Sequence, residues 1–218
     1  MFVHDLVQNN YPSITLTDKV SLALQLMDDY DVQHLCVVDE KKFIAIIGKN
    51  DLLDTDENAT VSSLYPSFIN SFVKINDHFT EALKIFSKTD LTIVPVIDNS
   101  KQLIGVITQH QIIKALAELM SVEEEGAVIV LEIDKKKFLL SEINRLVETN
   151  NTQIFQLNTI KENEDTLLVT LKVNKTEVSD IVATFQRYDY SVKYFIGEEH
   201  YTNELQENYE HLMSYLNV

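Results

Sequence analysis

The first half of the chain repeats one pattern of apolar and polar positions. Residues 14–39 align with residues 73–98 at an offset of 59, which pairs Asp18 with Asp77. After one inserted residue, FIAIIGKNDLL at 43–53 matches LIGVITQHQII at 103–113 at an offset of 60. A sequence that repeats itself at a fixed period predicts two copies of one supersecondary unit.

Each copy has the spacing of an amphipathic helix near its start. In the first copy, apolar residues recur at i, i+3, i+4 and i+7, as on one face of a helix, and residues 79–86 repeat this spacing. Polar pairs at 17–18 and 76–77 come just before and are predicted N-caps of these helices. A second helix is expected at the end of each copy, long in the second and cut short by the polar residues 54–58 in the first.

Two apolar runs separated by a polar turn follow the first helix of each copy. These runs are continuous rather than alternating, which predicts strands that are covered on both faces. The order is therefore β-α-β-β-α in each copy. Because such a unit is too small to bury its own helices, we expect the two copies to pack as a pair. The predicted strands lie at residues 35–38, 44–47, 93–97 and 103–107.

These strands carry a family resemblance. The pieces VPVID at 94–98 and GVITQHQI at 105–112, with LCVVD and AIIGKNDL in the first copy, resemble the strand motifs of the cystathionine β-synthase (CBS) domain. Two such copies resemble a tandem CBS pair, also called a Bateman module. The resemblance implies an α+β fold with the pair at 1–122 and its copies at about 14–58 and 73–121.

The resemblance also implies a ligand. The cleft between the copies of a CBS pair often binds an adenosine-containing molecule, with the Asp of a [ST]-x-x-D motif on the ribose hydroxyls. The first copy keeps this acid as Asp51 but has Gly48 for the Ser/Thr, whereas the second keeps Thr108 but has Gln111 for the acid. We therefore expect at most one good site per chain, the better candidate being the Asp51 side, with the backbone of Leu35 and Val94 able to read the adenine edge. The candidate ligand-binding residues are His34, Leu35, Gly48, Asp51, Val94, Thr108, His110 and Gln111.

Charge narrows the choice of ligand and partner. Asp and Glu total 34 against 18 Lys and Arg, a formal net charge of −16, and only Arg145 and Arg187 are arginines. Nucleic acid and anionic membranes are disfavoured as partners, because both need clustered basic residues. Residues 1–125 hold nine lysines against 19 acidic residues. This favours AMP or another adenosyl compound over ATP.

The second half changes pattern after Glu123-Glu124-Glu125-Gly126. Strand and helix periodicities predict the order β-α-β-β-α-β over 127–197, the ferredoxin-like split unit. Its position after a CBS pair makes it resemble an ACT domain, as in CBS–ACT proteins of the acetoin-utilisation group. Amino-acid binding, the usual role of ACT domains, is disfavoured because the first strand-to-helix turn lacks glycine, so pairing of sheets in a dimer is expected. Residues 198–218 are predicted to form a C-terminal amphipathic helix.

Catalytic chemistry finds no support in the sequence. The single cysteine, Cys36, excludes an intramolecular disulfide, and no histidine, serine or carboxylate pattern builds a catalytic or metal site. Without a signal peptide or a membrane-length apolar run, a cytoplasmic location is expected. We predict a non-catalytic regulatory homodimer that acts on an unidentified partner protein. The alternatives are a ligand-free dimerising module, a divalent-cation sensor, and a small enzyme that uses His34 and Cys36.

Overall fold

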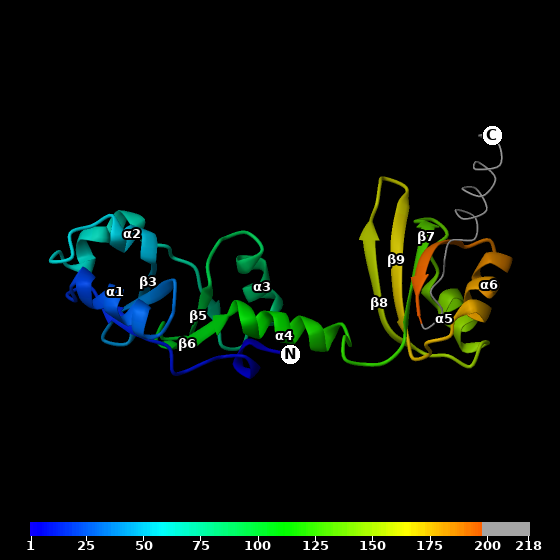
Figure 1. Ribbon diagram of the computed structural model, residues 1–218, viewed down its shortest axis with the longest axis horizontal. Helices are drawn as coiled ribbons and strands as arrows, with labels where there is room; N and C mark the ends of the chain where they lie inside the picture. Colours follow the sequence, from blue (N-terminus) through cyan, green and yellow to red (C-terminus); the bar gives the residue numbers. More distant parts are fainter. Residues whose placement is uncertain (198–218) are drawn as a thin grey trace, which may run out of the picture. The chain divides into compact units, whose positions relative to one another are not determined.

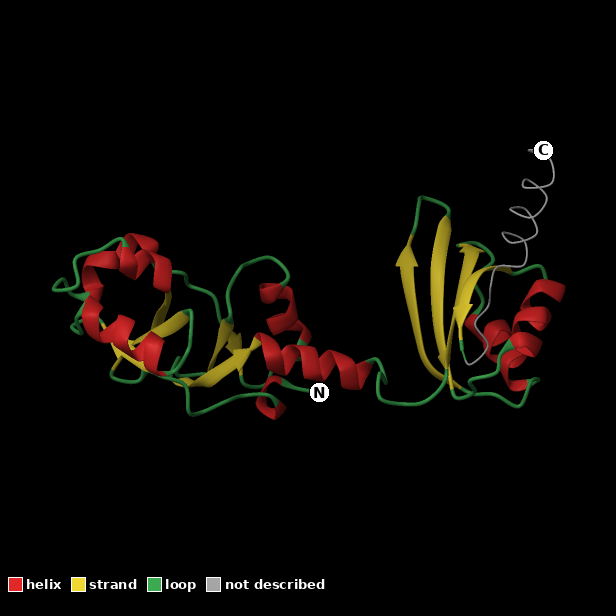
Figure 2. Cartoon of the chain, viewed as in Figure 1, coloured by secondary structure: helices red, strands yellow, loops and turns green. Residues whose placement is uncertain are grey.

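The computed structural model describes residues 1–197 of the 218-residue chain. The described residues divide into two compact units, Met1–Ala117 and a second that begins at Glu118, whose helices and strands are drawn in Figures 1 and 2. Among the described residues, no helix combines the length and the apolar character needed to cross a membrane. The amphipathic helix predicted for 198–218 lies outside the described residues.

The first unit contains the two predicted copies, each with the order β-α-β-β-α. In each copy a short first strand pairs in parallel with the second strand, which pairs antiparallel with the third. Copy one consists of β1 (Ser13–Thr15), α1 (Val20–Asp29), β2 (His34–Asp39), β3 (Lys42–Gly48) and α2 (Lys49–Leu53). Copy two consists of β4 (Val73–Lys74), α3 (Thr80–Phe86), β5 (Ile93–Ile97), β6 (Leu103–Thr108) and α4 (Gln109–Leu119). The short final helix of copy one agrees with the prediction.

The predicted N-caps of α1 and α3 were wrong in the same way in both copies. Neither helix has a side-chain hydrogen bond at its N-cap residue. Instead, Asp18 accepts the Thr15 backbone N–H at 2.6 Å and Asp77 accepts the Lys74 N–H at 2.8 Å. These carboxylates close the turn that leads from strand to helix, because an Asp side chain competes for nearby backbone donors wherever the chain bends.

Each copy also forms backbone hydrogen bonds with the segment that precedes the other copy in the sequence. Gln8 and Val106 of β6 exchange backbone hydrogen bonds of 2.8 and 3.0 Å, so the N-terminal segment, which includes the 3-10 helix η1 (Val3–Asp5), joins copy two. In the reverse direction, Ile69 exchanges bonds of 2.8 and 3.0 Å with Ile46 of β3. Ile69 lies just after the 3-10 helix η2 (Val61–Ser67), which leads from copy one to copy two.

Three buried clusters hold the first unit together. One belongs to copy one, a second to copy two with Val3 from the N-terminal segment, and a third joins the copies. The predicted packing of the copies as a pair is therefore confirmed. The third cluster consists of Cys36, Phe43, Ile46, Leu91, Ile93, Ile97 and Val106.

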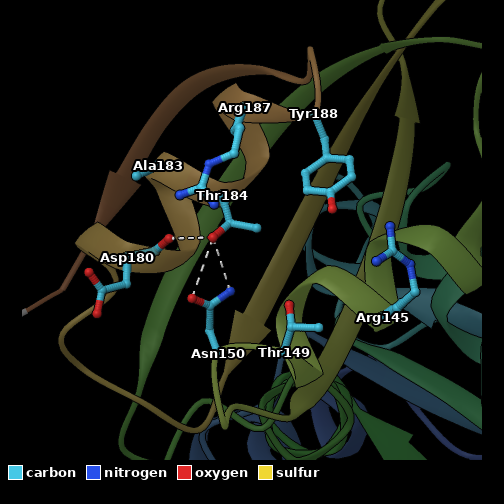
Figure 3. Close-up of a pocket in the computed structure, with 8 residues that line it drawn as sticks. All are labelled: Arg145, Thr149, Asn150, Asp180, Ala183, Thr184, Arg187 and Tyr188. Atoms are coloured by element: carbon cyan, nitrogen blue, oxygen red, sulfur yellow. Dashed lines mark hydrogen bonds between the residues drawn. The ribbon is translucent and has the colours of Figure 1, made fainter.

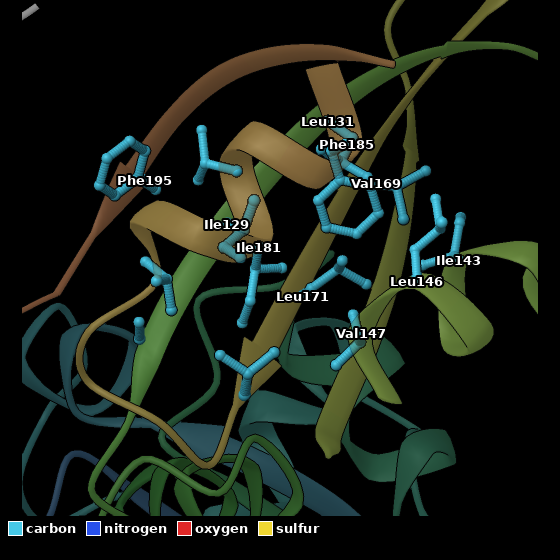
Figure 4. Close-up of a cluster of buried hydrophobic side chains, with 14 of the residues drawn as sticks. Ile129, Leu131, Ile143, Leu146, Val147, Val169, Leu171, Ile181, Phe185 and Phe195 are labelled. Atoms are coloured by element: carbon cyan, nitrogen blue, oxygen red, sulfur yellow. The ribbon is translucent and has the colours of Figure 1, made fainter. Parts of the chain in front are cut away.

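The second unit has the predicted β-α-β-β-α-β order. Its four strands form one antiparallel sheet in the order β10-β7-β9-β8, and α5 and α6 cover one face (Figure 4). The core between helices and sheet includes Phe185 and Leu146. This arrangement is consistent with an ACT-like domain. The elements are β7 (Ala127–Asp134), α5 (Leu140–Glu148), β8 (Ile154–Lys161), β9 (Thr166–Val173), α6 (Ser179–Arg187) and β10 (Ser191–Ile196).

Candidate functional site

The candidate residues gather where β3 and β6 end and the following helices begin. The two ends are built alike: the Lys49 backbone N–H donates to the Gln33 carbonyl at 2.9 Å, and the Gln109 N–H donates to the Thr92 carbonyl at 3.3 Å. This shared bond fixes the entry of α2 and α4 relative to the second strand of each copy. We call the two places the copy-one corner (His34, Gly48, Asp51) and the copy-two corner (Thr108, Gln111).

The copy-one corner brings together three of the predicted residues. Gly48 pairs with His34 across the β2–β3 hairpin. A Cβ at Gly48 would lie 3.2 Å from Asp51 Oδ2 and 3.7 Å from His34 Nε2, so the missing side chain leaves the carboxylate and the imidazole facing one small space. Asp51 is half-buried. Among the described residues, its carboxylate makes no hydrogen bond and no ion pair.

His34 of copy one is held by Thr92 of copy two. Its Nδ1 lies 2.8 Å from Thr92 Oγ1 and accepts the Thr92 backbone N–H at 3.3 Å. Because Nδ1 accepts, the proton of the neutral ring is placed on Nε2, the nitrogen near Asp51. Burial lowers the pKa of His34, and the Asp51 carboxylate partly opposes this shift. The imidazole thus links the two copies through Nδ1, while its Nε2 makes no hydrogen bond within the part of the chain that the structure describes.

The copy-two corner is closed on itself. The Thr108 backbone N–H donates to Gln111 Oε1 at 2.7 Å, and the Gln111 N–H donates to Thr108 Oγ1 at 3.4 Å. This reciprocal pair is a capping box at the start of α4. The residues expected to meet a ribose therefore satisfy the first turn of a helix instead, and the Gln111 carbonyl oxygen is already engaged.

The other predicted site residues are placed less favourably. The side chains of Leu35 and Val94 are fully buried, so only their backbone could meet a ligand. His110 is exposed on the first turn of α4. Lys49, which follows Gly48 and is the basic residue nearest to it in the sequence, forms an ion pair with Asp28 at 2.5 Å.

Two neighbours of the copy-one corner were not identified from the sequence. One is Thr92, and the other is Tyr11, whose hydroxyl donates to the His34 carbonyl at 3.0 Å. Burial raises the pKa of Tyr11, and the nearby Cys36 thiol adds to this effect. Both residues belong to the corner only because the chain folds back onto it. The repeat gives one indication for Thr92. It aligns with Gln33, the residue directly before His34, and so lies at the equivalent place in copy two.

Cys36 is not placed as a nucleophile. Its side chain is completely buried in the cluster between the copies, and burial raises its pKa to about 12. A thiol attacks as its thiolate, which this environment disfavours. Within residues 1–197, no group of three or more His, Cys, Asp or Glu side chains is arranged to hold a metal ion.

Comparison with known proteins agrees with the duplication. The model of the CBS domain matches residues 3–58 and again residues 69–118. The chain contains a tandem CBS domain pair. A crystal structure of a CBS domain pair/ACT domain protein from Thermotoga maritima is 29% identical, with a TM-score of 0.52, and the match covers 55% of this chain and 99% of that one.

Other solved CBS pairs resemble the chain less. CBSX2 from Arabidopsis thaliana is 18% identical with a TM-score of 0.49, covering 55% of this chain and 96% of that one. A structure of CBSX2 in complex with AMP is 21% identical with a TM-score of 0.48, covering 55% and 98%. CBS domain pair proteins are generally regulatory and non-catalytic, and they commonly form dimers.

Proposed function

We propose that the CBS pair binds one adenosine-containing ligand, AMP or another adenosyl compound, at the copy-one corner and signals its presence to a partner protein through a homodimer. The observation that carries this proposal is the Asp51 carboxylate. It is half-buried and has no hydrogen-bond or ion-pair partner among the described residues, while its counterpart Gln111 is engaged in a capping box.

The corner offers complementary groups to a nucleoside. The Asp51 carboxylate can accept both ribose hydroxyls in charge-assisted hydrogen bonds, and the neutral His34 can donate from Nε2. Gly48 places no side chain between them, where a Cβ would lie 3.2 Å from Asp51 Oδ2. The backbone of Leu35 lies next to His34 and supplies hydrogen-bonding groups for an adenine edge. Because Lys49 is paired with Asp28, a ligand with few phosphates suits this corner better than ATP.

The same contacts suggest how binding is transmitted. His34 touches the ligand space with one ring nitrogen and Thr92 of copy two with the other. A ligand that draws the imidazole toward itself changes the bond between the copies, and so favours one arrangement of the pair over another. The partner that reads this change is a protein, because the negative charge of the chain disfavours nucleic acid and anionic membranes.

Replacing Asp51 by alanine should abolish or strongly weaken nucleoside binding. Loss of a charge-assisted contact to two hydroxyls is expected to lower AMP affinity at least about tenfold. Isothermal titration of the full chain with AMP, S-adenosylmethionine and ATP measures this loss. Asp54→Ala is the matched control, since it removes the charge of an exposed neighbour. Equal affinity of Asp51→Ala and wild type would contradict the site, and no binding to any nucleoside would favour the ligand-free alternative.

An exposed apolar pair supports a dimer of the CBS units, with or without ligand. Leu53 at the end of α2 is 61% exposed and Ile113 on α4 is 64% exposed. They occupy matching positions in the two copies. Two large apolar side chains left in solvent at equivalent places are expected to be covered by a second copy of the chain.

The double variant Leu53→Asp/Ile113→Asp should therefore separate the CBS units and weaken the homodimer. Four buried charges across a two-fold interface have no partners, and each costs several kcal/mol (roughly 3–5 for an unpaired buried charge). Light scattering after size-exclusion chromatography over a dilution series should show dissociation to the monomer mass at a higher protein concentration than in the wild type. Leu22→Asp/Tyr30→Asp, at the comparably exposed Leu22 and Tyr30 of copy one, should leave the dimer intact. If the dimer of the Leu53→Asp/Ile113→Asp variant is as stable to dilution as the wild type, the interface lies elsewhere.

The second unit is proposed to act as an ACT-like dimerisation domain of the acetoin-utilisation type. Its first strand-to-helix turn, Asp134–Phe138, has no glycine that would let an amino acid approach the backbone. We propose a cytoplasmic location, in keeping with a single buried cysteine and no disulfide.

A further inference from the structure

A polar cavity in the second unit contains both arginines of the chain. It has a volume of about 440 Å³ and lies between α5 and α6, with Arg145 on the first helix and Arg187 at the end of the second (Figure 3). The other 16 of the 18 Lys and Arg residues in the sequence are lysines. Both guanidinium groups of a chain whose net charge is −16 therefore line the same cavity.

Neither guanidinium is neutralised within the described part of the chain. The ion pairs of the second unit join Lys193 to Glu132 and Glu162, and no carboxylate forms one with either arginine. Arg145 lies over the ring of Tyr188, 5.2 Å from its centroid, a cation–π contact that orients the group without cancelling its charge. Both arginines are exposed, so a dissolved anion can reach them.

The floor of the cavity fixes the spacing of the two helices that carry the arginines. The Asn150 amide donates to the Leu146 carbonyl at 2.8 Å and to Thr184 Oγ1 at 3.2 Å, and the Thr184 hydroxyl lies 2.8 Å from the Asp180 carbonyl as its donor. These groups satisfy one another. Recognition of an anion is therefore left to the guanidinium groups, whose helices this network joins.

One carboxylate is among the groups that line the cavity. It belongs to Asp180 in the first turn of α6, and Figure 3 shows its side chain pointing away from Asn150 and Arg145. The cavity thus has two positive charges against one negative charge at its rim. The lining therefore carries a net positive charge, which favours a small anion.

We propose that this cavity binds a small metabolite that carries a phosphate or carboxylate group, held by Arg145 and Arg187. Arginine presents a planar set of N–H donors that matches these oxyanions bidentately, which lysine cannot do. The volume lies in the range of small-molecule pockets. The simpler explanation is that both arginines only stabilise helix C-termini, where they lie in the last turn. Lysine would serve that purpose equally well.

The low arginine count makes a direct test possible. The full-length, ¹⁵N-labelled protein has only two arginine Nε–H signals, which Arg145→Lys and Arg187→Lys assign by removing one each. Inorganic phosphate, malonate and chloride are titrated at matched ionic strength. We expect both signals to follow one saturating curve with phosphate or with malonate, and not with chloride. The anion that saturates identifies the ligand as a phosphate or a carboxylate.

The variants decide whether the arginines act as a pair. Each Arg→Lys change should weaken the saturating anion about tenfold or more, because a charge-assisted bidentate contact is lost. Lys136→Gln, an exposed lysine of the same unit, should leave the affinity unchanged. The proposal is overturned if chloride shifts the signals as much as the oxyanions do. It is also overturned if neither oxyanion saturates, or if both Arg→Lys variants bind like wild type.

Discussion

Replacing Phe185 by alanine should lower the stability of the second unit by about 3–5 kcal/mol, the usual cost of deleting a buried phenyl ring. Phe185 is completely buried on the inner face of α6 and contacts Tyr190 edge-to-face, with ring centroids 5.7 Å apart. Tyr190 in turn donates to Glu142 of α5 at 3.0 Å. The ring therefore supports the sheet and both helices, and little nearby can collapse into the space it leaves.

Hydrogen exchange of the full chain is the suitable measurement, because it resolves the two units. Amides of β7 and β9 should lose protection in Phe185→Ala, while those of β2 and β5 keep it. Phe155→Ala on β8 is the matched control, since that ring is 42% exposed and its removal should cost less than about 1 kcal/mol. If Phe185→Ala lowered the protection of the β7 and β9 amides no more than Phe155→Ala does, the core would not depend on Phe185.

Gly105→Ala should release the N-terminal segment from copy two. A Cβ at Gly105 would lie 2.2 Å from the Gln8 carbonyl oxygen, closer than any real contact, and backbone must move to admit it. The segment then loses two backbone hydrogen bonds with Val106 and pulls Val3 from the core. Together these changes should cost about 2–4 kcal/mol.

The repeat supplies the control for this prediction. Ala45 occupies the position of Gly105 in copy one and is 2% exposed, so its methyl group is accommodated there. Ala45→Gly should cost only about 1 kcal/mol, from one methyl group and added chain freedom. Urea denaturation gives both values, and exchange of the Gln8 and Val106 amides reports release of the segment. A stable Gly105→Ala protein with protected amides would contradict the close approach.

Much of the fold could be predicted because the duplication states each pattern twice. A helix or strand predicted in one copy can be checked against the other copy. In this way a final helix was predicted in both, short for α2 and longer for α4. The N-cap prediction was wrong because the polar pairs before α1 and α3 form turns as readily as N-caps. Both copies carry such a pair, so comparing the copies could not decide between the two roles. The exchange of leading segments was not foreseen, since residues 1–10 and 69 lie before the repeated elements.

The site could be predicted only in part, for a similar reason. Asp51 and Gly48 were found because they occupy motif positions, and the structure brings them together with His34. Thr108 and Gln111 were interpreted as a half-kept ribose motif, yet the same four-residue spacing is that of a capping box. Thr92 and Tyr11 could not be found, because a contact between distant segments leaves no local pattern.

The reciprocal pairing of Gln8 with Val106 and of Ile69 with Ile46 means that neither copy is a separable module. Each copy pairs with the segment that comes directly before the other copy in the sequence. During synthesis the first ten residues cannot pair with β6 until β6 has been made, which is after all the strands and helices of copy one have been synthesised. A chain cut within η2, before Ile69, would yield two fragments that each lack a segment held by the other, and we expect them to regain their structure by complementation rather than alone.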